Sequence, residues 1–83
     1  AEGARALVAG GVRLVGIDAM SIEVCGAPGA PTHHALLAAR VVIIENLLLA
    51  DVPEGRYELT ALPLRIEGAD GAPARVLLRP IGA

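Results

Sequence analysis

The stretch Pro31–Leu47, P-T-H-H-A-L-L-A-A-R-V-V-I-I-E-N-L, contains the features that decide the fold of this 83-residue chain. Its first half is rich in alanine and leucine, as is typical of a short helix, and its second half has the β-branched residues of a buried strand. The two histidines of the chain, His33 and His34, stand side by side in the helical half. One carboxylate, Glu45, follows the apolar run of the strand. The stretch therefore predicts a helix and then a strand, with histidine and carboxylate at opposite ends.

The flanking sequence predicts further short elements on both sides. In the first half we expect a helix over 1–10, a strand over 12–17, a polar loop start over 18–23, a Gly- and Pro-rich loop over 25–31, a helix over 33–40 with Thr32 as its N-cap, and a strand over 41–44. In the second half we expect a turn or 3₁₀ segment over 47–52, a turn over 53–55, and two strands over 56–66 and 74–79 joined by a hairpin loop over 67–73. Pro63 predicts an edge or a bend within the first of these last two strands. Helices and strands mixed in this way favour an α/β fold with a mixed sheet and short helices, in a single domain over residues 1–83.

The composition is unusually apolar for so short a chain. Hydrophobic residues make up 54% of the sequence, the mean hydropathy is +0.60, and Tyr57 is the only aromatic residue. A domain of this size buries only about 60–65% of the surface that its unfolded chain exposes. We therefore expect exposed leucine, isoleucine and valine side chains that pack against a partner. That partner is either the remainder of the same polypeptide or a second copy in a homo-oligomer.

Charge and cysteine content exclude several classes of function. The net charge is −2, there is no lysine, and the seven arginines form no basic run, so we expect no nucleic-acid partner. The longest apolar runs are far shorter than the ~20 residues of a membrane-spanning helix, so we expect no membrane partner. Cys25 is the single cysteine, which rules out a disulfide within the chain. With no signal peptide visible, a cytoplasmic location is expected.

The helix-then-strand prediction brings His33 and Glu45 together. A helix from His33 to Arg40 rises about 10 Å at ~1.5 Å per residue. A strand from Val41 to Glu45 travels about 13 Å at ~3.3 Å per residue. If the strand runs back along the helix, the two lengths nearly cancel. Glu45 then returns to the start of the helix, beside His33.

Imidazole and carboxylate together are common ligands of Zn²⁺ or Mn²⁺. A divalent metal would also neutralise Glu45 at the end of a buried strand, and Asn46 could donate an outer hydrogen bond.

His34 points about 100° away from His33 on a helix, so both do not easily bind one ion. Other partners stay open: an arginine for Glu45, and a backbone carbonyl for His33. Two ligands are also fewer than the roughly three protein ligands of a catalytic zinc.

Four blocks of the sequence resemble, in order, the C-terminal part of the bacterial cyclase-like metal-dependent hydrolases, a family that includes the kynurenine formamidases (arylformamidases). These blocks are G-V-R-L-V-G-I-D-A-M-S-I-E, P-T-H-H-A-L-L, I-I-E-N-L and L-P-L-R-I-E-G-A-D-G-A-P-A-R. The resemblance implies that His33 and Glu45 are metal ligands and that His34 is not. It places Asp18 and Ser21 in a loop near the site, where a loop-shaping role is expected.

The resemblance also implies a fold and an activity. The fold is that of a swivelling β/β/α hydrolase, and the activity is metal-dependent hydrolysis of N-formyl amides, such as N-formylkynurenine, or of related amides. The family's principal metal motif, His-x-Gly-Thr-His-x-Asp, is absent from these 83 residues. We therefore expect the chain to be the C-terminal fragment of a larger hydrolase that contributes two metal ligands and is inactive alone.

Two alternatives follow from the residues alone. The chain could be a non-catalytic α/β module for interaction or oligomerisation, since it lacks a complete metal site. It could also use Cys25 as a nucleophile, although no base near Cys25 is visible in the sequence.

Overall fold

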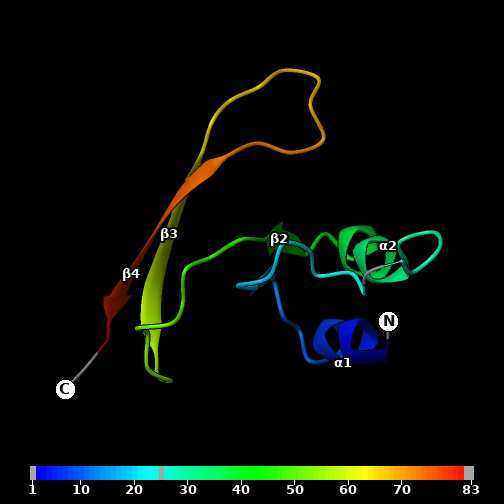
Figure 1. Cartoon of the computed structure of the whole chain (residues 1–83). Helices are drawn as coiled ribbons and strands as arrows, with labels where there is room; N and C mark the ends of the chain where they lie inside the picture. The colour runs from blue at the N-terminus through cyan, green and yellow to red at the C-terminus, as the bar shows by residue number, and fades with distance from the viewer. Residues whose placement is uncertain (1, 25, 82–83) are drawn as a thin grey trace. The chain divides into compact units, whose positions relative to one another are not determined.

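The computed structural model describes residues 2–24 and 26–81 of the chain (Figure 1). These residues contain two helices and four strands. The chain divides into two compact units, Ala1–Asp51 and Val52–Ala83. Both described helices belong to the first unit, and the second unit is built on a pair of strands.

The first unit is a small α/β structure. Its elements are α1 (Glu2–Ala9), β1 (Leu14–Gly16), α2 (Pro31–Ala38) and β2 (Val42–Ile44). The two strands are parallel, and Val15 of β1 lies opposite Ile43 of β2. The Ile17 N–H extends this pairing by donating to the Ile44 carbonyl at 2.9 Å. Because parallel strands need a crossover connection, the long loop and α2 carry the chain back so that β2 starts beside β1.

Among the described residues, three that are buried form the core of the first unit. They are Ala4 of α1, Leu36 of α2 and Val41, which directly precedes β2. Leu36 is fully buried, with 0% of its surface exposed. Partly buried apolar side chains surround them: Val8, Val12, Val15, Ile22, Ala35 and Ile43. This core holds α2 against α1 and against the strand that leads to Glu45.

The first helix ends where the glycine pair predicts. The Gly10 N–H donates to the Ala6 carbonyl and the Gly11 N–H to the Val8 carbonyl, both at 3.0 Å. Gly11 has a φ of +80°, a left-handed conformation that glycine adopts at no steric cost.

The second helix begins earlier than the sequence predicts, and Thr32 is not its N-cap. Ala30 occupies the N-cap position with a φ of +46° and offers no side-chain hydrogen bond. Pro31 follows as the first helical residue, a position where a missing N–H costs nothing. The first backbone N–H groups that need acceptors are therefore those of Thr32 and His33, and they find them outside the helix.

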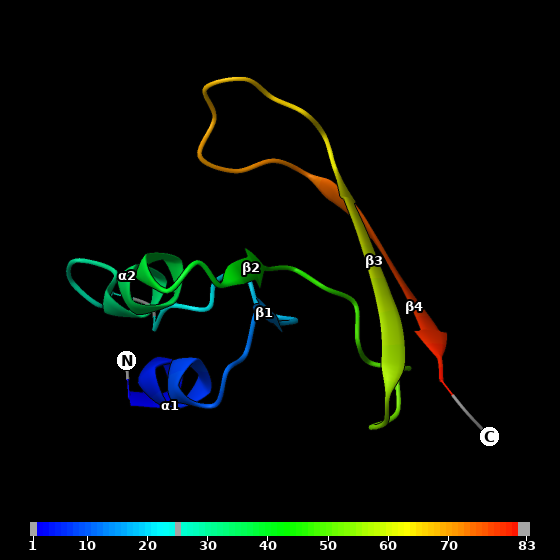
Figure 2. The same ribbon diagram turned by 180° about the vertical axis from the view of Figure 1, so that it is seen from behind.

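The second unit is a β-hairpin made of β3 (Tyr57–Pro63) and β4 (Ala74–Pro80) (Figure 2). The strands are antiparallel, and Leu59 lies opposite Leu78. Successive residues of a strand point to opposite faces, so one face of the hairpin is apolar. Its members are Tyr57, Leu59, Ala61, Pro63, Ala74, Val76, Leu78 and Pro80. Pro63 lies at the end of β3, as an edge or bend position predicts.

The predicted α/β class with short helices is confirmed. Both parallel and antiparallel pairing are present, and they are divided between two sheets of two strands each. No helix within the described part of the chain is long and apolar enough to cross a membrane. The prediction of a single domain over residues 1–83 stays a prediction.

Candidate metal-binding site

His33, in the first turn of α2, lies between two carboxylates. Its Nδ1 atom is 3.0 Å from Oε1 of Glu23, and its Nε2 atom is 3.1 Å from Oε2 of Glu45. The side chain of His33 is 30% exposed, that of Glu45 28% and that of Glu23 11%. The site is therefore open to solvent on the His33–Glu45 side and more enclosed at Glu23.

Glu45 reaches this position because it directly follows β2. Its Oε2 atom accepts a hydrogen bond from the Ile22 N–H at 2.8 Å, so the loop after β1 binds the same oxygen as His33. The backbone supports this loop, since the Asn46 N–H donates to the Ala19 carbonyl at 2.9 Å. The site thus lies at the carboxyl ends of the two parallel strands, where ligands commonly bind in α/β proteins.

Glu23 comes from the same loop and holds the start of α2. Its Oε2 atom accepts the Thr32 N–H at 3.0 Å, and its Oε1 atom accepts the His33 N–H at 2.9 Å. A carboxylate is a favourable acceptor at a helix N-terminus, because the helix dipole is positive there. The Glu23 N–H donates in turn to Oγ of Ser21 at 3.0 Å, which shapes the turn that carries Glu23.

These contacts shift the pKa of both Glu23 and His33. Burial would raise the pKa of Glu23, but the hydrogen bonds from the backbone of His33 and Thr32 and from the His33 ring outweigh it. The pKa falls from 4.5 to about 2. The hydrogen bond to Glu23 raises the pKa of His33 above 6.5; partial desolvation opposes this effect, and the charge of Glu45 adds to it.

The predicted proximity of His33 and Glu45 is confirmed, and the open alternatives for their partners are wrong. Within residues 2–24 and 26–81, both ring nitrogens of His33 face carboxylates rather than a backbone carbonyl, and Glu45 contacts His33 rather than an arginine. His34 is exposed, and its ring makes no hydrogen bond or ion pair within the described residues. The metal-ligand role of His33 and Glu45 stays a prediction.

The other residues that the sequence placed near the site differ in their roles. Ser21 shapes the loop, as expected, through its bond from Glu23. Asp18 is exposed, and its carboxylate makes no hydrogen bond or ion pair among residues 2–24 and 26–81. Asn46 contributes its backbone, with a φ of +61° that asparagine tolerates well, and no side-chain bond of Asn46 is seen there. Cys25 lies outside the described residues.

Glu23 is the residue of this cluster that the sequence did not point to. It ends the block G-I-D-A-M-S-I-E, in which Asp18 and Ser21 attracted attention first. The sequence favours Thr32 as the N-cap, and only the structure shows that α2 starts at Pro31 after Ala30, neither of which has a side chain that can cap a helix. A nearby carboxylate in the preceding loop was needed to accept the free N–H groups of that helix.

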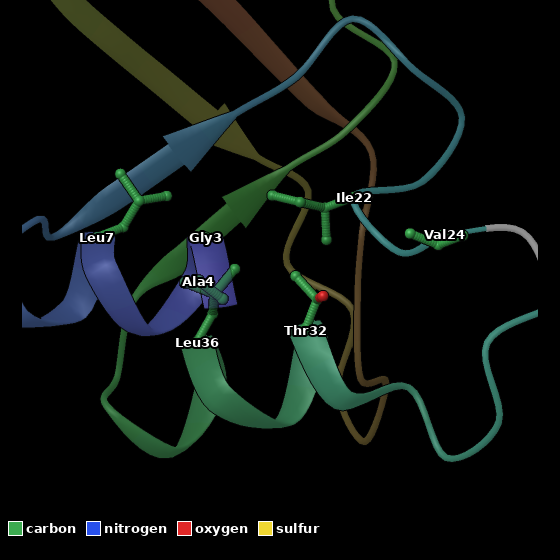
Figure 3. Close-up of a pocket in the computed structure, with 7 residues that line it drawn as sticks. All are labelled: Gly3, Ala4, Leu7, Ile22, Val24, Thr32 and Leu36. Carbon is green, nitrogen blue, oxygen red and sulfur yellow. The ribbon is translucent and has the colours of Figure 1, made fainter. Parts of the chain in front are cut away.

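Two hollows lie near the site. The first, of about 300 Å³, is lined almost entirely by apolar side chains of α1, α2 and the loop after β1, and Leu36 points toward Ala4 there (Figure 3). The second, of about 490 Å³, is lined by residues of the loop after β1, among them Ser21, Glu23 and Gly26. The linings of these hollows do not include His33 or Glu45, so the pair stands at the surface beside them.

Known proteins resemble the chain along almost its whole length. The kynurenine formamidase of Salinibacter ruber is 53% identical over 74 residues, which is 89% of this chain and 35% of the relative. That of Sphingopyxis alaskensis is 54% identical over 71 residues, 86% of this chain and 34% of the relative. No protein-family model matches the chain.

Solved structures agree with the sequence matches. A potential metal-dependent hydrolase with cyclase activity superposes with a TM-score of 0.84 at 56% identity, over 90% of this chain and 37% of the other. A predicted metal-dependent hydrolase from Bacillus stearothermophilus gives a TM-score of 0.82 at 56% identity, over 90% of this chain and 36% of the other. The chain matches the C-terminal part of the cyclase-like metal-dependent hydrolases. It spans about a third of the length of these relatives.

The residues of this chain fit one side of a metal site. The donors His33 Nε2 and Glu45 Oε2 are 3.1 Å apart, and two ligands of one tetrahedral zinc are separated by about 3.3 Å when each bond is ~2.0 Å. The other ring nitrogen already has a carboxylate partner, as metal-binding histidines usually do. Within the described residues no group of three or more His, Cys, Asp or Glu side chains is arranged to hold a metal ion. The segment therefore supplies part of a ligand set.

Proposed function

We propose that the chain forms one side of the divalent-metal site of an amide hydrolase that acts on N-formyl amides, such as N-formylkynurenine, or on related amides. The observation that carries the proposal is the contact between His33 Nε2 and Glu45 Oε2 at the carboxyl ends of β1 and β2. The names of the relatives, kynurenine formamidase and metal-dependent hydrolase, supply the reaction class.

The described residues would hold the ion from two directions. His33 would bind through Nε2 and Glu45 through its carboxylate, while Glu23 keeps Nδ1 of His33 occupied. A divalent ion bound there would polarise the substrate carbonyl and activate a water molecule for attack. The Ile22 N–H would keep the carboxylate of Glu45 in place, as Glu23 does the ring of His33. The remaining ligands and the proton-transfer group would come from sequence outside the described residues.

Zn²⁺ and Mn²⁺ are the metals proposed. One imidazole nitrogen and one carboxylate oxygen suit both, since zinc accepts N and O ligands and manganese favours carboxylates. The remaining ligands, which lie outside the described residues, would decide which of the two metals binds. We propose that the protein acts in the cytoplasm.

The proposal is tested on the complete protein that contains this chain, purified without chelators. We expect bound Zn²⁺ or Mn²⁺ by elemental analysis and hydrolysis of N-formylkynurenine. His33→Ala and Glu45→Gln should each remove most of the metal and the activity. His34→Ala is the matched control, because it removes the neighbouring imidazole, which touches neither carboxylate within the described residues. A folded, active protein without metal, or full metal binding by both ligand variants, would overturn the proposal.

A second candidate function is a non-catalytic module that binds the remainder of its polypeptide or a second copy of itself. It is favoured by the exposed apolar surface of the described residues. Leu48 is 96% exposed, Met20 84%, Leu64 62% and Leu62 59%. A protein of this kind would be folded and oligomeric in light scattering, and would neither bind metal nor hydrolyse formyl amides.

A further inference from the structure

The carboxylate of Glu23 has a geometry that the proposed metal site alone does not explain. It is the least exposed side chain of the cluster, at 11%, and it accepts three hydrogen bonds from the start of α2. Two of them come from backbone N–H groups and one from the ring of His33. Glu23 is 9 and 10 residues away from these partners in the sequence, so the contacts depend on the folded loop.

The backbone contacts fix Glu23 as an acceptor. A backbone N–H can only donate, so Oε2 accepts from Thr32 and Oε1 accepts from His33. An ionised carboxylate has no proton of its own to give. The Nδ1 atom of His33, 3.0 Å from Oε1, must therefore carry the hydrogen of that bond. Oε2 of Glu45 is also an acceptor, bonded by the Ile22 N–H at 2.8 Å, so Nε2 carries a hydrogen as well when the ring is charged. When the ring is neutral, the more enclosed Glu23, with 11% of its side chain exposed against 28% for Glu45, keeps the hydrogen on Nδ1, and the lone pair lies on Nε2.

The same contacts fix the orientation of the ring. One oxygen, Oε1 of Glu23, receives both the backbone N–H and the ring Nδ1–H of His33, at 2.9 Å and 3.0 Å. The imidazole is thus tied to the beginning of its own helix. The loop is fixed on the other side as well, since Ser21 binds the N–H of Glu23 and Glu45 binds the N–H of Ile22. Adjacent residues of a single loop therefore locate both proposed metal ligands.

We infer that Glu23 is a positioning residue: it selects the Nδ1–H tautomer and the rotamer of His33, so that Nε2 is presented beside Glu45 for a divalent ion. The inference rests on the proposed function, because the ion that Nε2 would bind is part of it. Glu23 itself has no place among the ligands, since its contact is with the opposite ring nitrogen. A carboxylate partner of this kind orients a metal-binding histidine, and its loss typically weakens metal binding by about 10–100-fold.

The test compares Glu23→Gln with the unmodified complete protein. The variant keeps the size of the side chain and loses the charge and one of the two acceptor oxygens. Glu2→Gln is the matched control, because it removes one carboxylate from the same unit at an exposed position without a described partner. The measurements are the Kd for Zn²⁺ and for Mn²⁺ by competition with a chelator, and the His33 tautomer in metal-free protein by imidazole ¹⁵N NMR above the pKa of the ring. His33→Gln assigns the His33 signals.

We expect Glu23→Gln to bind the ion about 10–100-fold more weakly and to lose the preference for Nδ1–H, while Glu2→Gln matches the unmodified protein. A helix cap alone would change thermal stability and leave the tautomer and the Kd unchanged. That result would overturn the inference and leave the proposed function standing. If His33→Gln binds the ion as tightly as the unmodified protein, the proposed function fails and the inference with it. If Glu23→Gln does not fold, the tautomer of the unmodified protein decides: Nδ1–H supports the inference, and Nε2–H overturns it.

Discussion

One carboxylate oxygen of Glu23 binds His33 at two points, the backbone nitrogen at 2.9 Å and the ring Nδ1 at 3.0 Å. The start of α2 and the direction of the imidazole are therefore set by the same atom. Any change that moves Glu23 should affect the helix terminus and the proposed metal ligand together. The effect on the helix terminus can be measured as a change in thermal midpoint, and the effect on the imidazole as a change in the pKa of His33.

The first prediction concerns the imidazole in metal-free protein. The pKa of His33 should lie above 6.5, chiefly because its ring is hydrogen-bonded to Glu23, with partial desolvation opposing and the charge of Glu45 assisting. Glu23→Gln and Glu45→Gln should each lower the pKa, since each removes a negative charge beside the ring. NMR titration of the His33 ring protons measures the effect. A pKa at or below 6.5 in the unmodified protein would contradict the prediction.

The second prediction concerns acid stability. The pKa of Glu23 is lowered from 4.5 to about 2, so its charged form favours the folded state. A lowered pKa gives a contribution that is complete above the unfolded value and is lost as the pH falls through the folded value. The difference in thermal midpoint between unmodified protein and Glu23→Gln should therefore be largest above about pH 5 and shrink as the pH falls toward 3. A difference that stays constant over this range would show that the charge of Glu23 contributes nothing.

The sequence predicts the first unit well because its signals are local. The glycine pair at Gly10-Gly11 ends α1, and the apolar run at 41–44 contains β2. The closeness of His33 and Glu45 follows from the lengths of one helix and one strand. When the strand runs back along the helix, these two lengths nearly cancel and bring the two residues together. These relationships involve residues no more than twelve positions apart.

The role of Glu23 and the true start of α2 were not predictable in the same way. Thr32 is the usual type of N-cap residue, and a sequence pattern favours it. The chain instead satisfies the helix terminus with a carboxylate from the preceding loop, a contact that exists only when that loop is folded. A contact that depends on the path of a Gly- and Pro-rich loop leaves no periodic signal in the sequence.

The third prediction concerns the core of the first unit. Leu36 has no exposed surface and lies between α1 and the strand that leads to Glu45. Leu36→Ala should lower the free energy of unfolding of the complete protein by about 2–5 kcal/mol, because it removes buried methyl groups and leaves a cavity. The neighbouring Leu37, 58% exposed, gives the control Leu37→Ala, with an expected loss well below that range. Urea unfolding measures both, and equal losses would contradict the assignment of the core.

The last prediction concerns stabilisation by metal. An ion that binds only the folded protein raises the free energy of unfolding by about 2.7 kcal/mol at 100 times its Kd. We expect Zn²⁺ or Mn²⁺ to raise the thermal midpoint of the metal-free protein, and a chelator to reverse the effect. Glu45→Gln should abolish the increase, because it removes one of the two proposed ligands, while Asp18→Asn should retain it, because the Asp18 carboxylate is exposed and contacts neither ligand in the described residues. An equal increase in Glu45→Gln would place the stabilising ion elsewhere in the protein.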